Sequence, residues 1–239
     1  MENRVTEIWV YLSQTPLLWL TMTLLVYQAA HWLYRRSGMM QVLNPVLLAV
    51  VGLVGILTGT GTSYTTYFEG AQFVHFLLGP ATVALAVPLY LNARKLREMA
   101  WAIGIGLFLG SLVAVFSAVL IGRALGLSDV ILLSLAPKSV TTPIAMGISE
   151  KIGGLPALTA VLVIVTGILG AVLGPGFLQR IGVRERSIQG FAIGLASHGI
   201  GTARAFLVDD ETGAFSGLAM GLNAVVTALL VPIVIHWLI

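Results

Sequence analysis

Long apolar runs alternate with short polar segments along most of the chain. Six runs contain no Asp, Glu, Lys or Arg, and they cover residues 8–34, 37–68, 70–93, 99–122, 152–179 and 212–239. A helix that crosses a bilayer needs about 20 mostly apolar residues. Each run exceeds that length, so the pattern predicts an all-α polytopic membrane protein with six transmembrane helices.

Two further apolar zones, 124–150 and 187–208, are interrupted by polar and helix-breaking residues. Proline lacks an amide hydrogen, and the residue before it avoids the α region. We therefore expect two interrupted or re-entrant helical zones, broken by Pro137, Pro143, Gly199 and Gly201. Irregular backbone at membrane depth survives only inside protein or along a wet cavity. The polar residues at these breaks are the candidate substrate-binding residues: Lys138, Ser139, Thr141, Thr142, Ser197, His198, Gly199, Thr202 and Arg204.

Composition supports the membrane class and excludes several functions. Hydrophobic residues make up 57% of the 239 residues and charged residues only 10%. Without cysteine there is no disulfide, Cys-ligated zinc, iron–sulfur cluster or thiol nucleophile. No basic patch interleaved with aromatics suggests nucleic-acid binding. No Ser-His-Asp order, carboxylate pair or His-x-x-x-His motif suggests an enzyme, so we expect no catalytic residue, metal or cofactor.

The basic residues predict an orientation. If zone 124–150 enters and leaves by one face, the opposite face holds Arg35, Arg36, Arg94, Lys95, Arg97, Arg180, Arg184 and Arg186. The face entered by zone 124–150 then holds only Arg4, Arg123 and Lys151. The positive-inside tendency places the richer face in the cytoplasm. The count leaves open whether zone 187–208 crosses or re-enters.

An internal repeat is visible in the glycine spacing. Residues 43–61 align without gaps on 158–176, which places Gly52, Gly55, Gly59 and Gly61 on Gly167, Gly170, Gly174 and Gly176. We interpret residues 1–239 as a single transmembrane domain of inverted repeats. It comprises an N-terminal segment with the first span (1–36), a first repeat (43–122), the broken zone 124–150, and a second repeat (152–239) that includes zone 187–208. Close packing of membrane helices alone also explains such glycines.

The chemistry of the breaks favours a small organic anion. A broken helix exposes amide groups at the N-terminus of its second half, where the helix dipole attracts negative charge. A lysine at mid-bilayer costs about 2.5–3.5 kcal/mol on insertion scales, so Lys138 needs a function, unless it reaches the interface or pairs with Glu150. Arg204 has the similar alternative of lying beside the acidic loop 209–211. His198 is the proton-coupling candidate, or else it only bonds a carbonyl. We interpret Asn223 as a polar contact between helices.

Three segments resemble the LrgB/CidB family of bacterial membrane proteins: LLGPATVALAVPLY (77–90), LAPKSVTTPIAMGISEKIGG (135–154) and GLASHGIGTARAF (194–206). The resemblance covers roughly residues 40–239. It implies a multi-pass protein of the bacterial inner membrane, in the lipid bilayer, with an LrgA/CidA-like small membrane partner in a homo- or hetero-oligomer. A plant relative that fuses both components is the plastid glycolate/glycerate transporter, and bacterial relatives are described as pyruvate-handling systems and as antiholin-like regulators of murein hydrolase activity and lysis. The residues favour a proton-coupled transporter of small monocarboxylates; the alternative is a lysis regulator that transports nothing.

Overall fold

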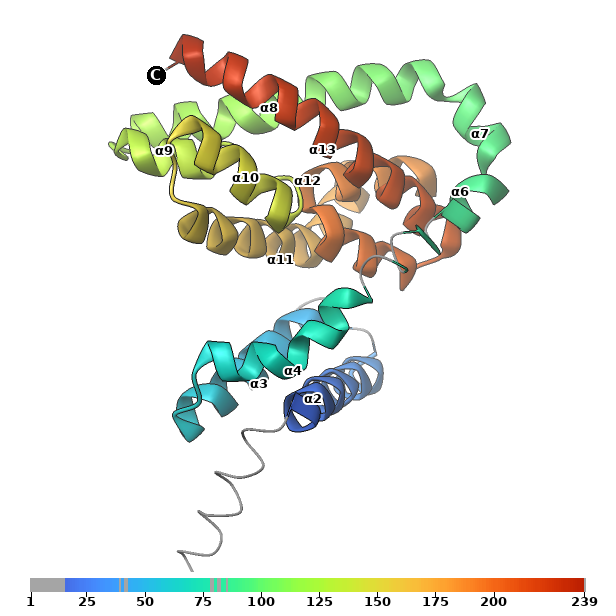
Figure 1. Ribbon diagram of the computed structural model, residues 1–239. Coiled ribbons are helices and arrows are strands. Elements are labelled where there is room, and N and C mark those ends of the chain that lie inside the picture. Colours follow the sequence, from blue (N-terminus) through green and yellow to red (C-terminus); the bar gives the residue numbers. More distant parts are fainter. Residues whose placement is uncertain are drawn as a thin grey trace, which may run out of the picture. The chain divides into compact units, whose positions relative to one another are not determined.

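The computed structural model describes residues 16–38, 40, 43–77, 80, 83–84 and 86–238, and the chain divides into two compact units. The first unit is Met1–Ala84 and the second is Leu85–Ile239. All the regular structure in the described ranges is helical (Figure 1). This confirms the all-α class expected from the apolar runs.

The first unit contains α2 (Pro16–Arg36), α3 (Pro45–Thr60) and α4 (Tyr64–Phe76), and α2 packs against both of the others. Trp19 is fully buried, and its ring meets that of Tyr67 edge-on at 6.0 Å between centroids. Gly70 brings α4 against the start of α2, because a β-carbon there would overlap the Pro16 carbonyl oxygen. An aromatic contact and a close backbone approach therefore join these two helices.

Local sequence signals set the bounds of several helices. The side chain of Asn44 accepts hydrogen bonds from the amides of Val46 and Leu47, at 2.9 and 3.2 Å, which caps the start of α3. The left-handed Gly61 (φ 65°) ends α3, and Gly153 (φ 89°) ends α10 in the same way.

The second unit holds the remaining described helices. They are α6 (Ala86–Leu91), α7 (Ala93–Glu98), α8 (Ala100–Ala124), α9 (Asp129–Leu135), α10 (Thr142–Ile152), α11 (Pro156–Arg180), α12 (Arg186–Phe206) and α13 (Asp210–Leu238). Within the described residues, α8, α11 and α13 are long and apolar enough to cross a membrane. They correspond to the predicted spans 99–122, 152–179 and 212–239.

The helices described within the other three predicted spans are shorter or less apolar than α8, α11 and α13. Run 8–34 overlaps α2, run 37–68 holds the 16-residue α3 and the start of α4, and run 70–93 holds the end of α4 and α6. Parts of these runs, including residues 8–15, 78–79 and 81–82, lie outside the described residues. The six spans therefore remain a prediction, and the structure provides suitable helices for three of them.

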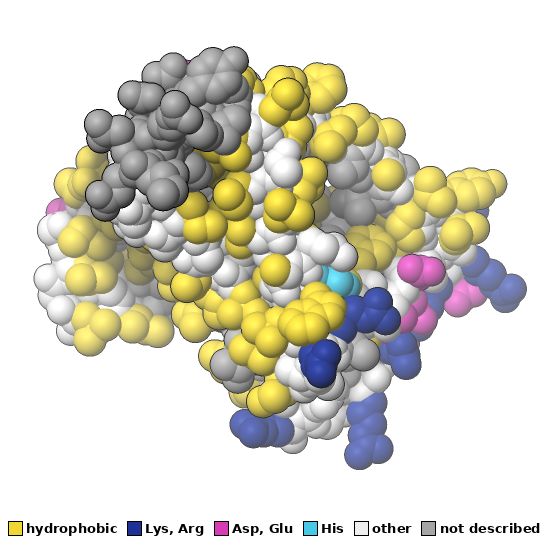
Figure 2. Space-filling view, turned by 90° about the horizontal axis from the view of Figure 1, so that it is seen from below, with side chains coloured by type: hydrophobic (Ala, Val, Ile, Leu, Met, Phe, Trp, Pro, Cys, Tyr) yellow, Lys and Arg dark blue, Asp and Glu magenta, His cyan; other side chains and the backbone are white. Residues whose placement is uncertain are grey.

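Hydrophobic side chains cover much of the surface seen in Figure 2, and most of the acidic side chains in view lie close to basic ones. Exposed residues of the three long helices include Val113 at 65%, Leu173 at 61% and Leu229 at 66%. Exposed apolar surface of this extent is a property of proteins surrounded by lipid. The surface thus supports the membrane class inferred from composition.

Candidate functional site

The first break separates α9 from α10, within zone 124–150. α9 ends at Leu135, and residues 136–141 form turns in which the Lys138 amide donates to the Leu135 carbonyl at 3.1 Å. Pro143 occupies the first turn of α10, where its missing amide hydrogen costs nothing. Pro137 therefore lies inside the break, and Pro143 lies in the first turn of the helix that follows it.

The second break lies at His198, in the middle of α12. Its backbone angles, φ 41° and ψ −134°, are non-helical, and His198 is the non-glycine residue with positive φ in the described part of the chain. Gly199 and Gly201 keep helical geometry, so their prediction as the helix-breaking residues is wrong. Hydrogen bonds hold the unusual conformation instead: the His198 ring Nε2 lies 3.0 Å from the Val163 carbonyl, and Thr202 Oγ1 donates to the His198 carbonyl at 2.9 Å.

Asn223 of α13 joins the two breaks. Its side-chain Nδ2 donates to the carbonyl of Ser139, in the first break, at 3.1 Å, and to the carbonyl of Leu195, just before the second, at 3.0 Å. Its Oδ1 accepts from Ser111 Oγ at 2.6 Å and from Thr227 Oγ1 at 3.1 Å. One buried side chain thus bonds both broken helices as well as α8 and α13.

Two glycines of α11 make room for the second break. A β-carbon at Gly167 would lie 2.7 Å from His198 Cε1, and one at Gly170 would overlap Ser197 Oγ. Gly174, one turn further on, meets only Ile193 at 3.8 Å, an ordinary contact. Part of the repeated glycine pattern is therefore required by the irregular backbone of α12.

The α12–α13 contact is equally close. β-carbons at Gly190 and Gly194 would overlap the carbonyl oxygens of Thr212 and Ser216 in α13. Thr202 Oγ1 also lies 2.9 Å from Ser216 Oγ, beyond the break. Both halves of α12 are thereby held against the first half of α13.

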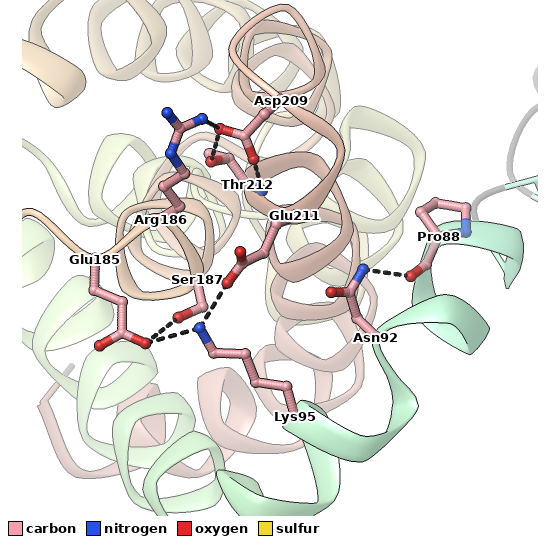
Figure 3. A network of polar contacts seen from close by, with 9 residues as sticks. All are labelled: Pro88, Asn92, Lys95, Glu185, Arg186, Ser187, Asp209, Glu211 and Thr212. Atoms are coloured by element: carbon pink, nitrogen blue, oxygen red, sulfur yellow. Dashed lines mark hydrogen bonds and ion pairs between the residues drawn. The ribbon is translucent and has the colours of Figure 1, made fainter.

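One end of the second unit is tied together by ion pairs, and we call it the α7 end. Lys95 Nζ of α7 lies 2.9 Å from Glu185 Oε1 and 2.7 Å from Glu211 Oε1. Arg186 pairs with Asp209, which also accepts from the Thr212 amide at the start of α13 (Figure 3). The segments before α12 and before α13 therefore meet at the α7 end, and α12 begins and ends there.

The Lys95–Glu185 pair favours the charged form of both its members. The hydrogen bonds to Glu185 and Glu211 raise the pKa of Lys95, and the bond from Lys95 lowers the pKa of Glu185. The Lys95–Glu185 pair therefore weakens when the pH falls through the lowered pKa of Glu185 or rises through the raised pKa of Lys95. Exposed pairs of this kind contribute little stability individually, but together they fix the arrangement of three segments.

Zone 124–150 begins and ends at the opposite end of the second unit. α8 runs away from the α7 end, and Arg123 in its last turn donates to the Leu238 carbonyl of α13. The Leu155 amide, just before α11, donates to Ser134 Oγ at 2.8 Å. The two broken zones thus enter the unit from opposite ends, and Asn223 bonds their central segments.

The predicted site residues do not all lie together. Lys138 and Ser139 belong to the first break, where Lys138 Nζ donates to Ser139 Oγ at 3.3 Å, and Thr141 and Thr142 begin α10. Ser197, His198, Gly199 and Thr202 surround the second break. Arg204 is buried in the last turn of α12, six residues beyond His198 and towards the α7 end.

Sequence reasoning underestimated Asn223. It is 1% exposed and interacts with both breaks, whereas the sequence suggested only a contact between helices. The available signal was a lone amide in an apolar run, which does not reveal its partners. Ser111, which donates to Asn223, and Ser216, which bonds Thr202, carried no sequence signal. Among the described residues no group of three His, Asp or Glu side chains is placed to hold a metal ion.

Comparisons with known proteins match nearly the whole chain. The LrgB-like family matches residues 23–237. "Uncharacterized protein YwbG" of Bacillus subtilis is 37% identical over 92% of this chain and 97% of its own length. "Holin-like protein CidB" of Staphylococcus aureus is 34% identical over 92% of this chain and 95% of its own length. No solved structure matches.

Proposed function

The chain belongs to the LrgB-like family, and we propose that it transports small monocarboxylates across the bacterial inner membrane. The substrates proposed are 2-hydroxy and 2-keto acids such as glycolate, glycerate and pyruvate. The observation that carries the proposal is the joining of two broken helices by Asn223 in the interior of the second unit. Broken helices that meet near the bilayer midplane form the substrate sites of many transporters.

In the proposed membrane arrangement, α8, α11 and α13 cross the bilayer. α9 with α10 re-enters from one face and α12 re-enters from the other, because each zone begins and ends at one end of the unit. Such a pairing of re-entrant segments is what inverted repeats produce. It also satisfies the requirement that irregular backbone at membrane depth be enclosed by protein.

The first break offers chemistry suited to a carboxylate. The N-terminus of α10 has no side-chain cap, so its first amides are available to an anion. Lys138 is half-buried beside Ser139. One cation, helix amides and hydroxyl groups can bind the carboxylate and the 2-hydroxyl or 2-keto oxygen of a small acid. Lys138 is proposed as the main charge that binds the substrate.

His198 is proposed to couple transport to protons. It lies in the second break, and Asn223 links that break to the Lys138 segment. An imidazole that binds a proton with each substrate anion makes the transport step electroneutral. Electroneutral movement avoids electrical work of about 2.3 kcal/mol per charge per 100 mV. Uptake is therefore expected to increase with an inward proton gradient.

A second function is favoured by the name of one relative, "Holin-like protein CidB". Under this alternative the chain is an antiholin-like regulator of murein hydrolase activity and lysis, and it transports nothing. An LrgA/CidA-like small membrane protein is proposed as a partner under either function. The regulator does not require polar groups at two joined breaks, so we rank it second.

The test is uptake of labelled glycolate, glycerate and pyruvate by the purified chain in liposomes, with and without the partner. Lys138→Ala is expected to weaken substrate affinity about 10–150-fold, the effect of losing one charge-assisted hydrogen bond. Lys151→Ala removes the same charge from the exposed end of α10 and serves as the matched control. His198→Gln is expected to retain exchange between preloaded substrates and to lose accumulation driven by a proton gradient.

The outcomes separate the two functions. Absence of uptake of all three acids, with the partner present and the protein folded, would rule out the transporter and favour the regulator. Uptake with equal kinetics in the Lys138→Ala and Lys151→Ala variants would retain the transporter and remove Lys138 from the site. Normal accumulation by His198→Gln would remove His198 from coupling.

A further inference from the structure

A groove lies along the C-terminal part of α2, in the first unit, whereas the residues assigned to transport belong to the second unit. It is lined by Gln28, His31, Trp32, Arg35 and Arg36, and its volume is about 400 Å³. The lining residues recur at spacings of three and four, so they share one face of the helix. Two cations, an aromatic ring and two hydrogen-bonding side chains therefore line one groove.

The positive charge of this groove is not neutralised within its own helix. α2 contains two arginines and no Asp or Glu. The Arg36 guanidinium lies over the Trp32 ring, 5.3 Å from its centroid, which restrains the side chain near the groove. The C-terminus of a helix carries about half a negative charge. Two full positive charges exceed it, so the groove favours an anion.

His31 contributes an imidazole ring to the groove wall. Its ring stacks on Tyr27 at 6.3 Å and lies 6.4 Å from the ring of Tyr34. Within the described part of the chain, its Nδ1 is buried and makes no hydrogen bond. Since a buried atom is out of reach of a molecule in the groove, the imidazole ring contributes to the groove wall by packing.

An apolar track continues from the groove along α2. Leu25, Gln28, Trp32 and Arg36 are spaced by three, four and four residues and so lie on one face of the helix. Leu25 is 61% exposed, and its neighbour Leu24 is 55% exposed. Exposed leucines beside arginines and tryptophan match the boundary between acyl chains and headgroups. The ligand that fits is anionic at one end and apolar along the rest.

We propose that this groove binds an anionic phospholipid, with the headgroup phosphate between Arg35 and Arg36 and an acyl chain along Leu24 and Leu25. Guanidinium groups hold phosphate oxygens through paired charge-assisted hydrogen bonds. Trp32 packs at the level of the headgroup. The site is independent of the proposed transport activity.

The test measures lipid binding by the full-length protein in detergent, by native mass spectrometry during titration with phosphatidylglycerol or phosphatidylcholine. We expect the parent to retain phosphatidylglycerol in preference to phosphatidylcholine. The double variant Arg35→Gln/Arg36→Gln should bind phosphatidylglycerol about 10–100-fold more weakly, as expected for loss of charge-assisted bonds. Arg94→Gln/Arg97→Gln removes the same charge from exposed positions of α7 and should bind like the parent.

Three results would overturn the proposal. One is equal phosphatidylglycerol binding by the parent and the Arg35→Gln/Arg36→Gln variant. Another is an equal loss in both double variants, which would show only a general charge effect. The third is displacement of the lipid by millimolar inorganic phosphate, which would indicate a site for free phosphate rather than for a lipid. Unchanged thermal unfolding of both variants controls for misfolding.

Discussion

At the scale of single residues, Asn223 uses all of its hydrogen-bonding capacity. A primary amide has two N–H donors and a carbonyl oxygen that accepts two bonds, and the structure provides partners for all of them. Asn223 therefore has no position left for a substrate. Its function in the proposed transporter is to hold the backbone of the two breaks at a fixed separation.

Replacing Asn223 by Asp tests this assignment. A carboxyl group has at most one proton to donate, so at least one buried carbonyl, of Ser139 or Leu195, loses its partner. We expect a loss of about 1–3 kcal/mol for each unsatisfied carbonyl, measured as thermal or denaturant unfolding in detergent. Asn44→Asp is the matched control, because the Asn44 side-chain oxygen accepts from the Val46 and Leu47 amides at the start of α3, a capping role that Asp fills equally well. Equal stability of the two variants would contradict the assignment.

The residue scale also shows where sequence reasoning failed. Glycines 199 and 201 were predicted to break the helix because glycine tolerates unusual backbone angles. The structure places the unusual angles at His198, since the Val163 carbonyl and Thr202 hydroxyl bond that residue and α11 leaves space for its ring. Propensity describes a residue by itself, and here hydrogen bonds within α12 and to α11 decide.

At the scale of helices, the repeated glycine spacing has a different structural role in each copy. In α11, Gly167 and Gly170 face the second break. In α3, a β-carbon added at Gly55 or Gly59 would meet open space, and Gly61 ends the helix. The repeated spacing was visible in the sequence, but which copy packs against irregular backbone depends on the neighbouring helix.

Two substitutions in α11 should therefore have opposite effects. At Gly170 an alanine β-carbon would overlap Ser197 Oγ and lie 2.9 Å from Ser197 Cβ, so Gly170→Ala should destabilise by about 1–3 kcal/mol through overpacking. At Gly174 there is room, and Gly174→Ala should stabilise the helix by about 0.5–1 kcal/mol. The measurement is unfolding of the two variants in the same detergent.

A third variant identifies the cause of the Gly170 effect. Adding Ser197→Ala to Gly170→Ala removes the overlapping hydroxyl and should restore part of the lost stability. If Gly170→Ala and Gly174→Ala changed the stability by the same amount, the close approach of α11 to the second break would be contradicted.

At the scale of the whole molecule, the sequence predicted the class and the location of the breaks better than the number of spans. Composition and charge-free runs depend on the solvent around the protein, so they are readable without tertiary information. Membrane spans are harder to predict over α2, α3 and α4, because the sequences of these helices contain threonine, tyrosine and histidine and the helices differ in length. The meeting of the two breaks could not be predicted, since it depends on bonds from Asn223 across the second unit.

The arrangement of the second unit sharpens the orientation predicted from basic residues. Residues 93–98 and 180–186 lie at the α7 end, and the Lys95–Glu211 pair adds the acidic loop 209–211 to it. The positive-inside tendency places this end in the cytoplasm. Cysteines introduced one at a time at the exposed positions Arg97, Arg184 and Asp210 should therefore be protected from impermeant thiol reagents in intact cells.

The opposite end supplies the positive control. Ser128 is exposed between α8 and α9, so Ser128→Cys should react from outside. The native chain has no cysteine, so each signal reports a single position. If α12 crossed the membrane instead of re-entering, Arg184→Cys and Asp210→Cys would label from opposite sides. Reaction of Asp210→Cys with protection of Arg184→Cys would therefore contradict the re-entrant arrangement. It would also contradict the proposed substrate site, because that site requires two half-helices that meet from opposite faces.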